Sequence, residues 1–140
     1  MEKPSQSIFK VGAIGVPYNP GSKGKNVEKG AEALKKAGRI IRLKEFAEVV
    51  DFGDLRVALP VPDCSNPKLL NPNQVEILCT ALRDKIKIIA EAGYLPLILG
   101  GDCSLLMGAV EGLRSATLKL GMIYMDAHGD FNLLTLPLQG

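Results

Sequence analysis

Two aspartates and the single histidine of the chain occupy alternate positions, Asp126, His128 and Asp130, directly after the apolar run GMIYM. Alternate residues of an extended chain point to the same side. One imidazole and two carboxylates would therefore face a common point, and such donors suit Mn²⁺ or a similar divalent ion. The spacing predicts a metal site. The alternative is a polar exit from a strand, with Asp130 and Asn132 as turn residues.

A second polar group, GGDCS at 100–104, also follows an apolar run and precedes a helical pattern. Functional groups gather at such places in parallel α/β sheets. The alternative is a strand–turn–helix junction with Asp102 or Ser104 as the helix cap. A right-handed crossover brings the carboxyl ends of neighbouring parallel strands to one edge of the sheet. We therefore expect this group to lie near Asp126.

The elements that would position these residues alternate along the chain. Strands are expected at 8–17, 48–54, 95–101 and 120–126. Helical patterns cover about 27–49, divided at Gly38, then 72–92 and 104–118, and 55–70 reads as an irregular connection. Asn71 and Pro72 suit the start of the middle helix, and Gly93 suits its end. This alternation predicts an α/β fold whose parallel sheet is covered on both faces, as a single domain over residues 1–140.

Composition gives no support for several classes of partner. The chain is 46% hydrophobic with a net charge of +2, which gives no reason to expect nucleic acid or an anionic membrane. No apolar run is long enough to span a bilayer. The three cysteines, Cys64, Cys79 and Cys103, are odd in number and lack CxxC spacing, which favours free thiols in a reducing compartment. The predicted location is the cytoplasm.

Two segments together, LILGGDCSLLMGAV and GMIYMDAHGDFN, resemble the arginase/agmatinase (ureohydrolase) family, which carries G-G-D-H-S and D-A-H-x-D-x-N at this relative spacing. The stretch GVPYNPGSKGKNVEKGAEALKKAGRI is similar to that family's first strand, loop and helix. The resemblance runs from about Ile8 to Asn132. It implies a three-layer αβα fold with a parallel sheet. It also implies Mn²⁺-dependent hydrolysis of a small guanidino compound, such as arginine or agmatine, to urea and an amine.

The resemblance assigns roles to the first motif. Asp126 would bridge two Mn²⁺ ions and His128 would bind one of them. Asp130 would bind the other and also contact the hydroxide that bridges the metals and attacks the substrate, and Asn132 would contact the substrate. Cys103 stands where the family has a metal-binding histidine. It is either a thiolate ligand, better suited to Zn²⁺ than to Mn²⁺, or an inert buried thiol near the site.

The family's domain is about twice as long as this chain, and its second half supplies further metal ligands, a proton-shuttling histidine and much of the oligomer interface. We therefore interpret the sequence as an N-terminal portion of a ureohydrolase-like domain, with weak or no activity by itself. Uncovered apolar helix faces and a sheet edge would favour a homo-oligomer or pairing with a longer family member. A non-catalytic protein that binds metal weakly, or regulates a full-length relative, is the competing hypothesis.

Overall fold

The computed structural model describes residues 9–63, 65, 70–117 and 119–127. Three parallel strands in the order β2-β1-β3 form its sheet. They are β1 (Phe9–Val16), β2 (Ala47–Asp54) and β3 (Leu95–Gly100). The strands predicted at 8–17, 48–54 and 95–101 are thereby confirmed, with small differences at their ends.

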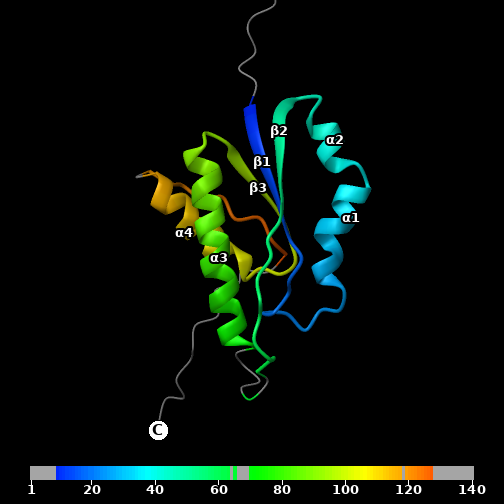
Figure 1. The fold of residues 1–140 in the computed structure, drawn as a ribbon, viewed down its shortest axis with the longest axis vertical. Coiled ribbons are helices and arrows are strands. Elements are labelled where there is room, and N and C mark those ends of the chain that lie inside the picture. The colour runs from blue at the N-terminus through cyan, green and yellow to red at the C-terminus, as the bar shows by residue number, and fades with distance from the viewer. Residues whose placement is uncertain (1–8, 64, 66–69, 118, 128–140) are drawn as a thin grey trace, which may run out of the picture.

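Helices lie on both faces of this sheet. They are the 3-10 turn η1 (Val27–Lys29), α1 (Gly30–Lys36), α2 (Arg39–Leu43), α3 (Pro72–Glu91) and α4 (Leu105–Ala116). Figure 1 shows α3 and α4 on one side of the strands and α1 and α2 on the other. The predicted three-layer αβα arrangement is therefore present. No helix among the described residues is long and apolar enough to cross a membrane.

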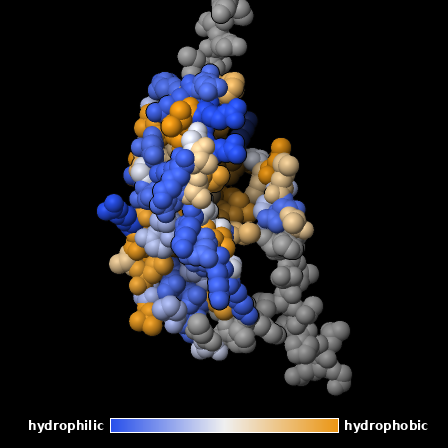
Figure 2. Space-filling model, turned by 90° about the vertical axis from the view of Figure 1, so that its right-hand side faces the viewer, coloured by the Kyte–Doolittle hydropathy of each residue, from blue (hydrophilic) through white to orange (hydrophobic). Residues whose placement is uncertain are grey.

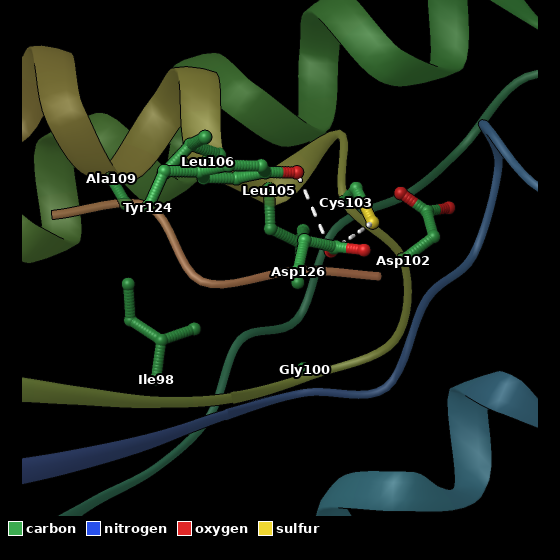
Figure 3. A pocket seen from close by; sticks show the side chains of 9 residues that line it. All are labelled: Ile98, Gly100, Asp102, Cys103, Leu105, Leu106, Ala109, Tyr124 and Asp126. Atoms are coloured by element: carbon green, nitrogen blue, oxygen red, sulfur yellow. Dashed lines mark hydrogen bonds between the residues drawn. The ribbon is translucent and has the colours of Figure 1, made fainter. Parts of the chain in front are cut away.

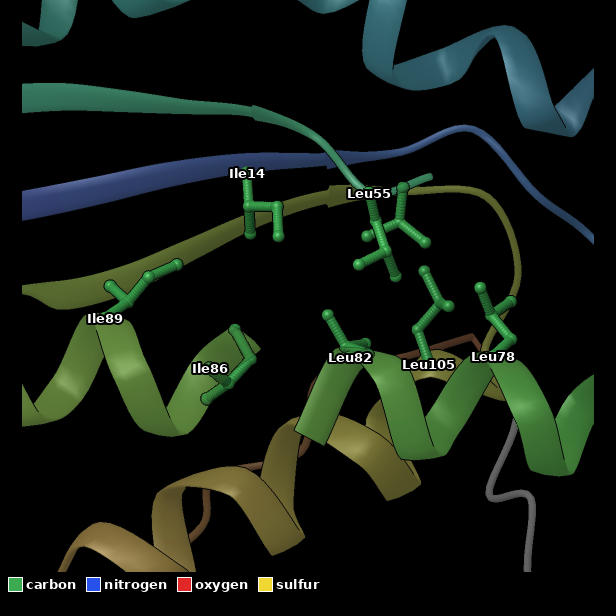
Figure 4. Close-up of a cluster of buried hydrophobic side chains, with 8 residues drawn as sticks. Ile14, Leu55, Leu78, Leu82, Ile86, Ile89 and Leu105 are labelled. Atoms are coloured by element: carbon green, nitrogen blue, oxygen red, sulfur yellow. The ribbon is translucent and has the colours of Figure 1, made fainter. Parts of the chain in front are cut away.

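The main core lies between the sheet and α3. Leu78, Leu82, Ile86 and Ile89 recur at helical spacing along α3 and are fully buried, as is Ile14 of β1. Figure 4 shows Leu78, Leu82 and Ile89 pointing from α3 toward the strands and Ile14 pointing from β1 toward the helix. Burying one such side chain contributes about 1.5–3 kcal/mol, so this layer stabilises the fold more than any other.

The opposite layer is smaller. Ala13 and Leu99 of the sheet pack against Ala31 of α1 and Ile40 of α2. Seen from the α1 and α2 side, the surface is mainly hydrophilic with scattered hydrophobic side chains (Figure 2). Two short helices with few buried residues cannot bury as much apolar area as the 20-residue α3.

Local sequence signals explain where the helices begin and end. Gly38 separates α1 from α2 with φ 71°, and Gly93 follows α3 with φ 82°, both in the left-handed region that favours glycine. Pro72 is the first residue of α3, as predicted. Asn71 precedes it but makes no side-chain cap. Its Nδ2 instead donates to the Pro20 carbonyl at 2.8 Å, which ties the start of α3 to the loop after β1.

The fourth strand predicted at 120–126 was wrong. No residue of the described stretch 119–127 is in a strand. Ile123 and Met125 are 91% and 90% exposed, so the apolar run is not buried there. A strand needs a hydrogen-bonded neighbour and a layer that covers its apolar side chains. An apolar run in the sequence does not by itself establish that either of these is present.

Candidate metal centre

The candidate site lies at the carboxyl end of β3, where the chain turns into α4. Gly101 permits this turn because a Cβ there would collide with the backbone carbonyl of Tyr18. The loop after β3 therefore lies directly against the loop after β1. A Cβ on Gly100 would instead meet the end of the Leu105 side chain, so only Gly101 is required by close backbone approach.

Asp102 fastens these two loops together. Its Oδ2 accepts the Gly21 amide at 2.9 Å, and its Oδ1 accepts the Ser104 amide at 2.9 Å as well as the Ser104 hydroxyl. Of the two caps proposed from the sequence, the Asp102 side chain therefore serves the start of α4. The Ser104 side chain makes no cap hydrogen bond. Because both Asp102 oxygens accept hydrogen bonds, this carboxylate is a structural brace.

The side chains of Cys103 and Asp126 lie close together next to Asp102. Cys103 Sγ lies 3.8 Å from Asp126 Oδ2, and the Tyr124 hydroxyl donates to the same oxygen at 3.4 Å. Figure 3 shows the three side chains converging above the end of β3. The predicted proximity of the GGDCS group to Asp126 is confirmed, although an extended segment and not a strand carries Asp126. Cys103 is exposed, so the interpretation of this residue as a buried thiol was wrong.

Two hollows flank this pair and share Asp102 and Cys103. One has a volume of about 290 Å³ and lies between β3, α4 and the segment that carries Asp126. The other, of about 360 Å³, lies between the loops after β1 and β3 and is also lined by Gly21, Ser22 and Ser104. The second hollow has a more polar lining than the first, although apolar atoms predominate in both. Cys103 lines both hollows, which is an arrangement suited to a small ligand.

A second thiol lies behind the site and differs in its chemistry. Cys79 of α3 is half-buried, and its Sγ donates to the Ser104 carbonyl at 3.2 Å. Burial raises the pKa of Cys79 above its ordinary value. This group therefore stays a neutral thiol at neutral pH, and a neutral thiol is a poor ligand and a poor nucleophile.

The donors present fit a divalent cation. A sulfur and a carboxylate oxygen 3.8 Å apart can both contact one ion. Within the described part of the chain no three His, Cys, Asp or Glu side chains gather to complete a site. His128, Asp130 and Asn132 lie outside the described residues, so their predicted roles remain predictions. The hydrogen bonds from Gly21 to Asp102 and from Tyr124 to Asp126 were not predicted, because no sequence pattern indicates them.

Comparison with known proteins identifies the fold and the family. Residues 9–136 match the arginase family. The chain belongs to the arginase family. It is 36% identical over 130 residues to mitochondrial arginase-2 of Bos taurus, covering 91% of this chain and 36% of that protein. It is 37% identical over 124 residues to human arginase-1, covering 87% of this chain and 38% of that protein.

Solved structures of arginases agree with this assignment. The native arginase of Bacillus caldovelox superposes with a TM-score of 0.79 at 30% identity, covering 89% of this chain and 43% of that one. The arginase of Bacillus cereus gives 0.76 at 37% identity, covering 89% and 41%. The family resemblance carried by the two motifs is confirmed. This arginase-family chain spans less than half the length of the relatives it matches.

Proposed function

We propose that this chain provides part of the metal centre of a hydrolase that cleaves a guanidino C–N bond to give urea and an amine. The observation that carries the proposal is the 3.8 Å approach of Cys103 Sγ to Asp126 Oδ2 at the carboxyl end of β3. It brings both sequence motifs to the edge where parallel α/β sheets hold their functional groups. Membership of the arginase family supports the same reaction class.

The proposed roles follow the motif DAHGDFN. Asp126, His128 and Asp130 would hold the metal, which in this proposal is Mn²⁺, two ions per complete site. Asp130 would also orient the water that attacks the guanidinium carbon, and Asn132 would contact the substrate. When bound, a divalent metal supplies Lewis acidity that makes water a nucleophile at neutral pH.

Two contacts in the described structure would support these roles. The Tyr124 hydroxyl holds one Asp126 oxygen, which limits rotation of that carboxylate. Asp102 fixes the loop that presents Cys103 by binding Gly21 and Ser104. We expect the activity of this chain to be weak, because Asp126, His128 and Asp130, even with Cys103, are too few ligands to hold two ions tightly.

Urea release tests the proposal directly. The metal-stripped chain is supplied with Mn²⁺ and then, separately, with arginine, agmatine or guanidinobutyrate. Slow urea formation from at least one guanidino compound, dependent on metal and lost in Asp126→Asn, is expected. Asp84→Asn is the control, because Asp84 is an exposed aspartate on α3 that pairs with Arg83 and lines neither hollow of the site. Metal binding with no urea above the Asp126→Asn background would contradict the proposed reaction.

A second candidate function rests on a different observation. Met122, Ile123 and Met125 are large apolar side chains that are mostly exposed on the segment leading to Asp126. Such side chains favour association with another protein surface. This supports a regulator that pairs with itself or with a longer arginase-family protein. Co-elution with a full-length arginase, lost when the three residues are replaced by serine, would favour this role; separate elution at micromolar concentrations would oppose it.

A further inference from the structure

The site contains a donor pair of mixed character. Cys103 contributes a sulfur from the loop after β3, and Asp126 contributes an oxygen from the segment that crosses above it (Figure 3). Both side chains are exposed, so an ion can reach them from solvent. Thiolate sulfur is a soft ligand, which binds Zn²⁺ and Co²⁺ well and Mn²⁺ poorly.

We infer that Cys103 and Asp126 form a thiolate–carboxylate chelate that selects Zn²⁺ or Co²⁺ over Mn²⁺ at this metal position. The inference rests on the proposed function, because it concerns the same site. It departs from that proposal in the identity of the metal.

The two donors are close enough to contact one ion. Cys103 Sγ lies 3.8 Å from Asp126 Oδ2 in a thiol–carboxylate hydrogen bond. Metal–sulfur and metal–oxygen bonds of about 2.3 Å and 2.1 Å would let one ion contact both atoms. The preference for Zn²⁺ or Co²⁺ follows from the donor chemistry, because Mn²⁺ prefers oxygen-rich sites.

The surrounding hydrogen bonds leave the Cys103–Asp126 pair, and not a pair of carboxylates, to bind the ion. Asp102 is the nearest alternative donor on the same loop, but both of its oxygens accept hydrogen bonds from Gly21 and Ser104. The Tyr124 hydroxyl donates to Asp126 Oδ2 at 3.4 Å, which limits the orientations of that carboxylate. The ion would replace the thiol proton between sulfur and oxygen, so one proton passes to solvent and no electron is transferred.

The direct test is Co²⁺ titration of the metal-free chain under a phosphine reductant, followed by absorption spectroscopy. A Cys64→Ser/Cys79→Ser background leaves Cys103 as the only thiol of the chain. A sulfur-to-cobalt charge-transfer band in the near ultraviolet, together with the visible bands of tetrahedral Co²⁺, is expected in this background. Adding Cys103→Ser should remove the charge-transfer band. Binding of Co²⁺ without that band would overturn the inference.

Competition between metals gives a second, independent readout. The ratio of Zn²⁺ to Mn²⁺ affinity should fall by at least roughly tenfold in Cys103→Asp, because an oxygen replaces the soft donor. Cys79→Ser serves as the control and should leave the ratio unchanged. Equal ratios in the parent chain and in Cys103→Asp would overturn the inference. Circular dichroism of each variant establishes that it is folded before the titration.

The outcomes separate this inference from the proposed reaction. The charge-transfer band reports only whether sulfur binds the metal, and urea release reports only hydrolysis. Urea formation by a chain that binds metal without sulfur would refute the chelate and leave the hydrolase proposal standing. A charge-transfer band in a chain that never forms urea would support the chelate and refute the reaction.

Discussion

Two regions of the molecule differ most in solvent exposure. One is the layer between α3 and the sheet, and the other is the set of loops at the carboxyl end of β3. Leu78, Leu82 and Ile86 on α3 are fully buried, whereas Cys103 and Asp126 are exposed. The first region consists of aliphatic groups held by packing, and the second of polar groups held by hydrogen bonds. Substitutions should therefore affect stability in one region and binding in the other.

The largest effect is expected from truncation in the buried layer. Leu82→Ala removes three buried carbons and leaves a cavity, so the free energy of unfolding should fall by about 3–4 kcal/mol. Chemical denaturation monitored by circular dichroism measures this loss. Ile88→Ala, at a 55% exposed position on the same helix, should cost less than about 1 kcal/mol. Similar losses in both variants would show that α3 is not packed against the sheet in solution.

A smaller but still clear effect is expected where α3 and α4 approach each other. A Cβ on Gly112 would lie 2.6 Å from the Arg83 carbonyl oxygen and 2.8 Å from Ile86 Cβ. Gly112→Ala should therefore lower the free energy of unfolding by about 1–3 kcal/mol, despite the better helix propensity of alanine. Gly121→Ala, which meets nothing within 4 Å, is the matched control. Stabilisation by Gly112→Ala in thermal unfolding would contradict the close helix contact.

Much of the buried layer could be predicted from sequence, because helical periodicity is a local property of the chain. The apolar spacing along 72–91 and the Asn71-Pro72 pair located α3 to within a residue. Asn71 nevertheless has φ 45° and donates to Pro20, 51 positions away, and no local pattern reveals such a contact.

The exposed edge was predicted less well because its geometry depends on contacts between distant segments. The meeting of Cys103 with Asp126 followed from strand topology. The Asp102–Gly21 bond, which spans 81 positions, did not. The fourth strand was predicted wrongly, because an apolar run at 120–126 cannot establish whether a neighbouring strand is present to pair with it.

Substitution of Asp102 should affect both stability and metal binding, because its hydrogen bonds hold the loop that presents Cys103. Asp102→Ala removes acceptors for the Gly21 and Ser104 amides, so the free energy of unfolding should fall by about 1–2 kcal/mol. The same change should loosen the loop that presents Cys103 and so weaken metal binding. Denaturation and metal titration measure the two effects. Unchanged values in both would show that the brace does not position the site.

The smallest effect is expected at a surface ion pair. Lys35 Nζ lies 2.8 Å from Asp54 Oδ1 and 3.3 Å from Asp51 Oδ1, joining α1 to β2. Burial lowers the pKa of Lys35, but Asp54 and Asp51 together outweigh burial and raise it above 10.5. Lys35→Met should therefore cost about 0.5–1 kcal/mol at pH 7, since both carboxylates remain near solvent.

The pH dependence of that cost follows from the raised pKa. A lysine whose pKa is higher when folded stabilises the protein fully below the unfolded pKa and loses this contribution as pH rises through the folded pKa. The difference between Lys35→Met and the parent chain should thus be constant near neutrality and shrink above about pH 10.5. Denaturation at pH 7 and pH 11 measures it. A difference that grows with pH would contradict the assigned ion pair.

The most direct test of this division compares the parent chain with Asp126→Asn. Calorimetric titration with a divalent metal measures binding, and denaturation in metal-free buffer measures the free energy of unfolding. Asp126→Asn should weaken metal binding at least roughly tenfold while changing the free energy of unfolding by less than about 0.5 kcal/mol. Equal metal affinity in the two proteins would contradict the assignment of Asp126 to a metal centre at the carboxyl end of β3.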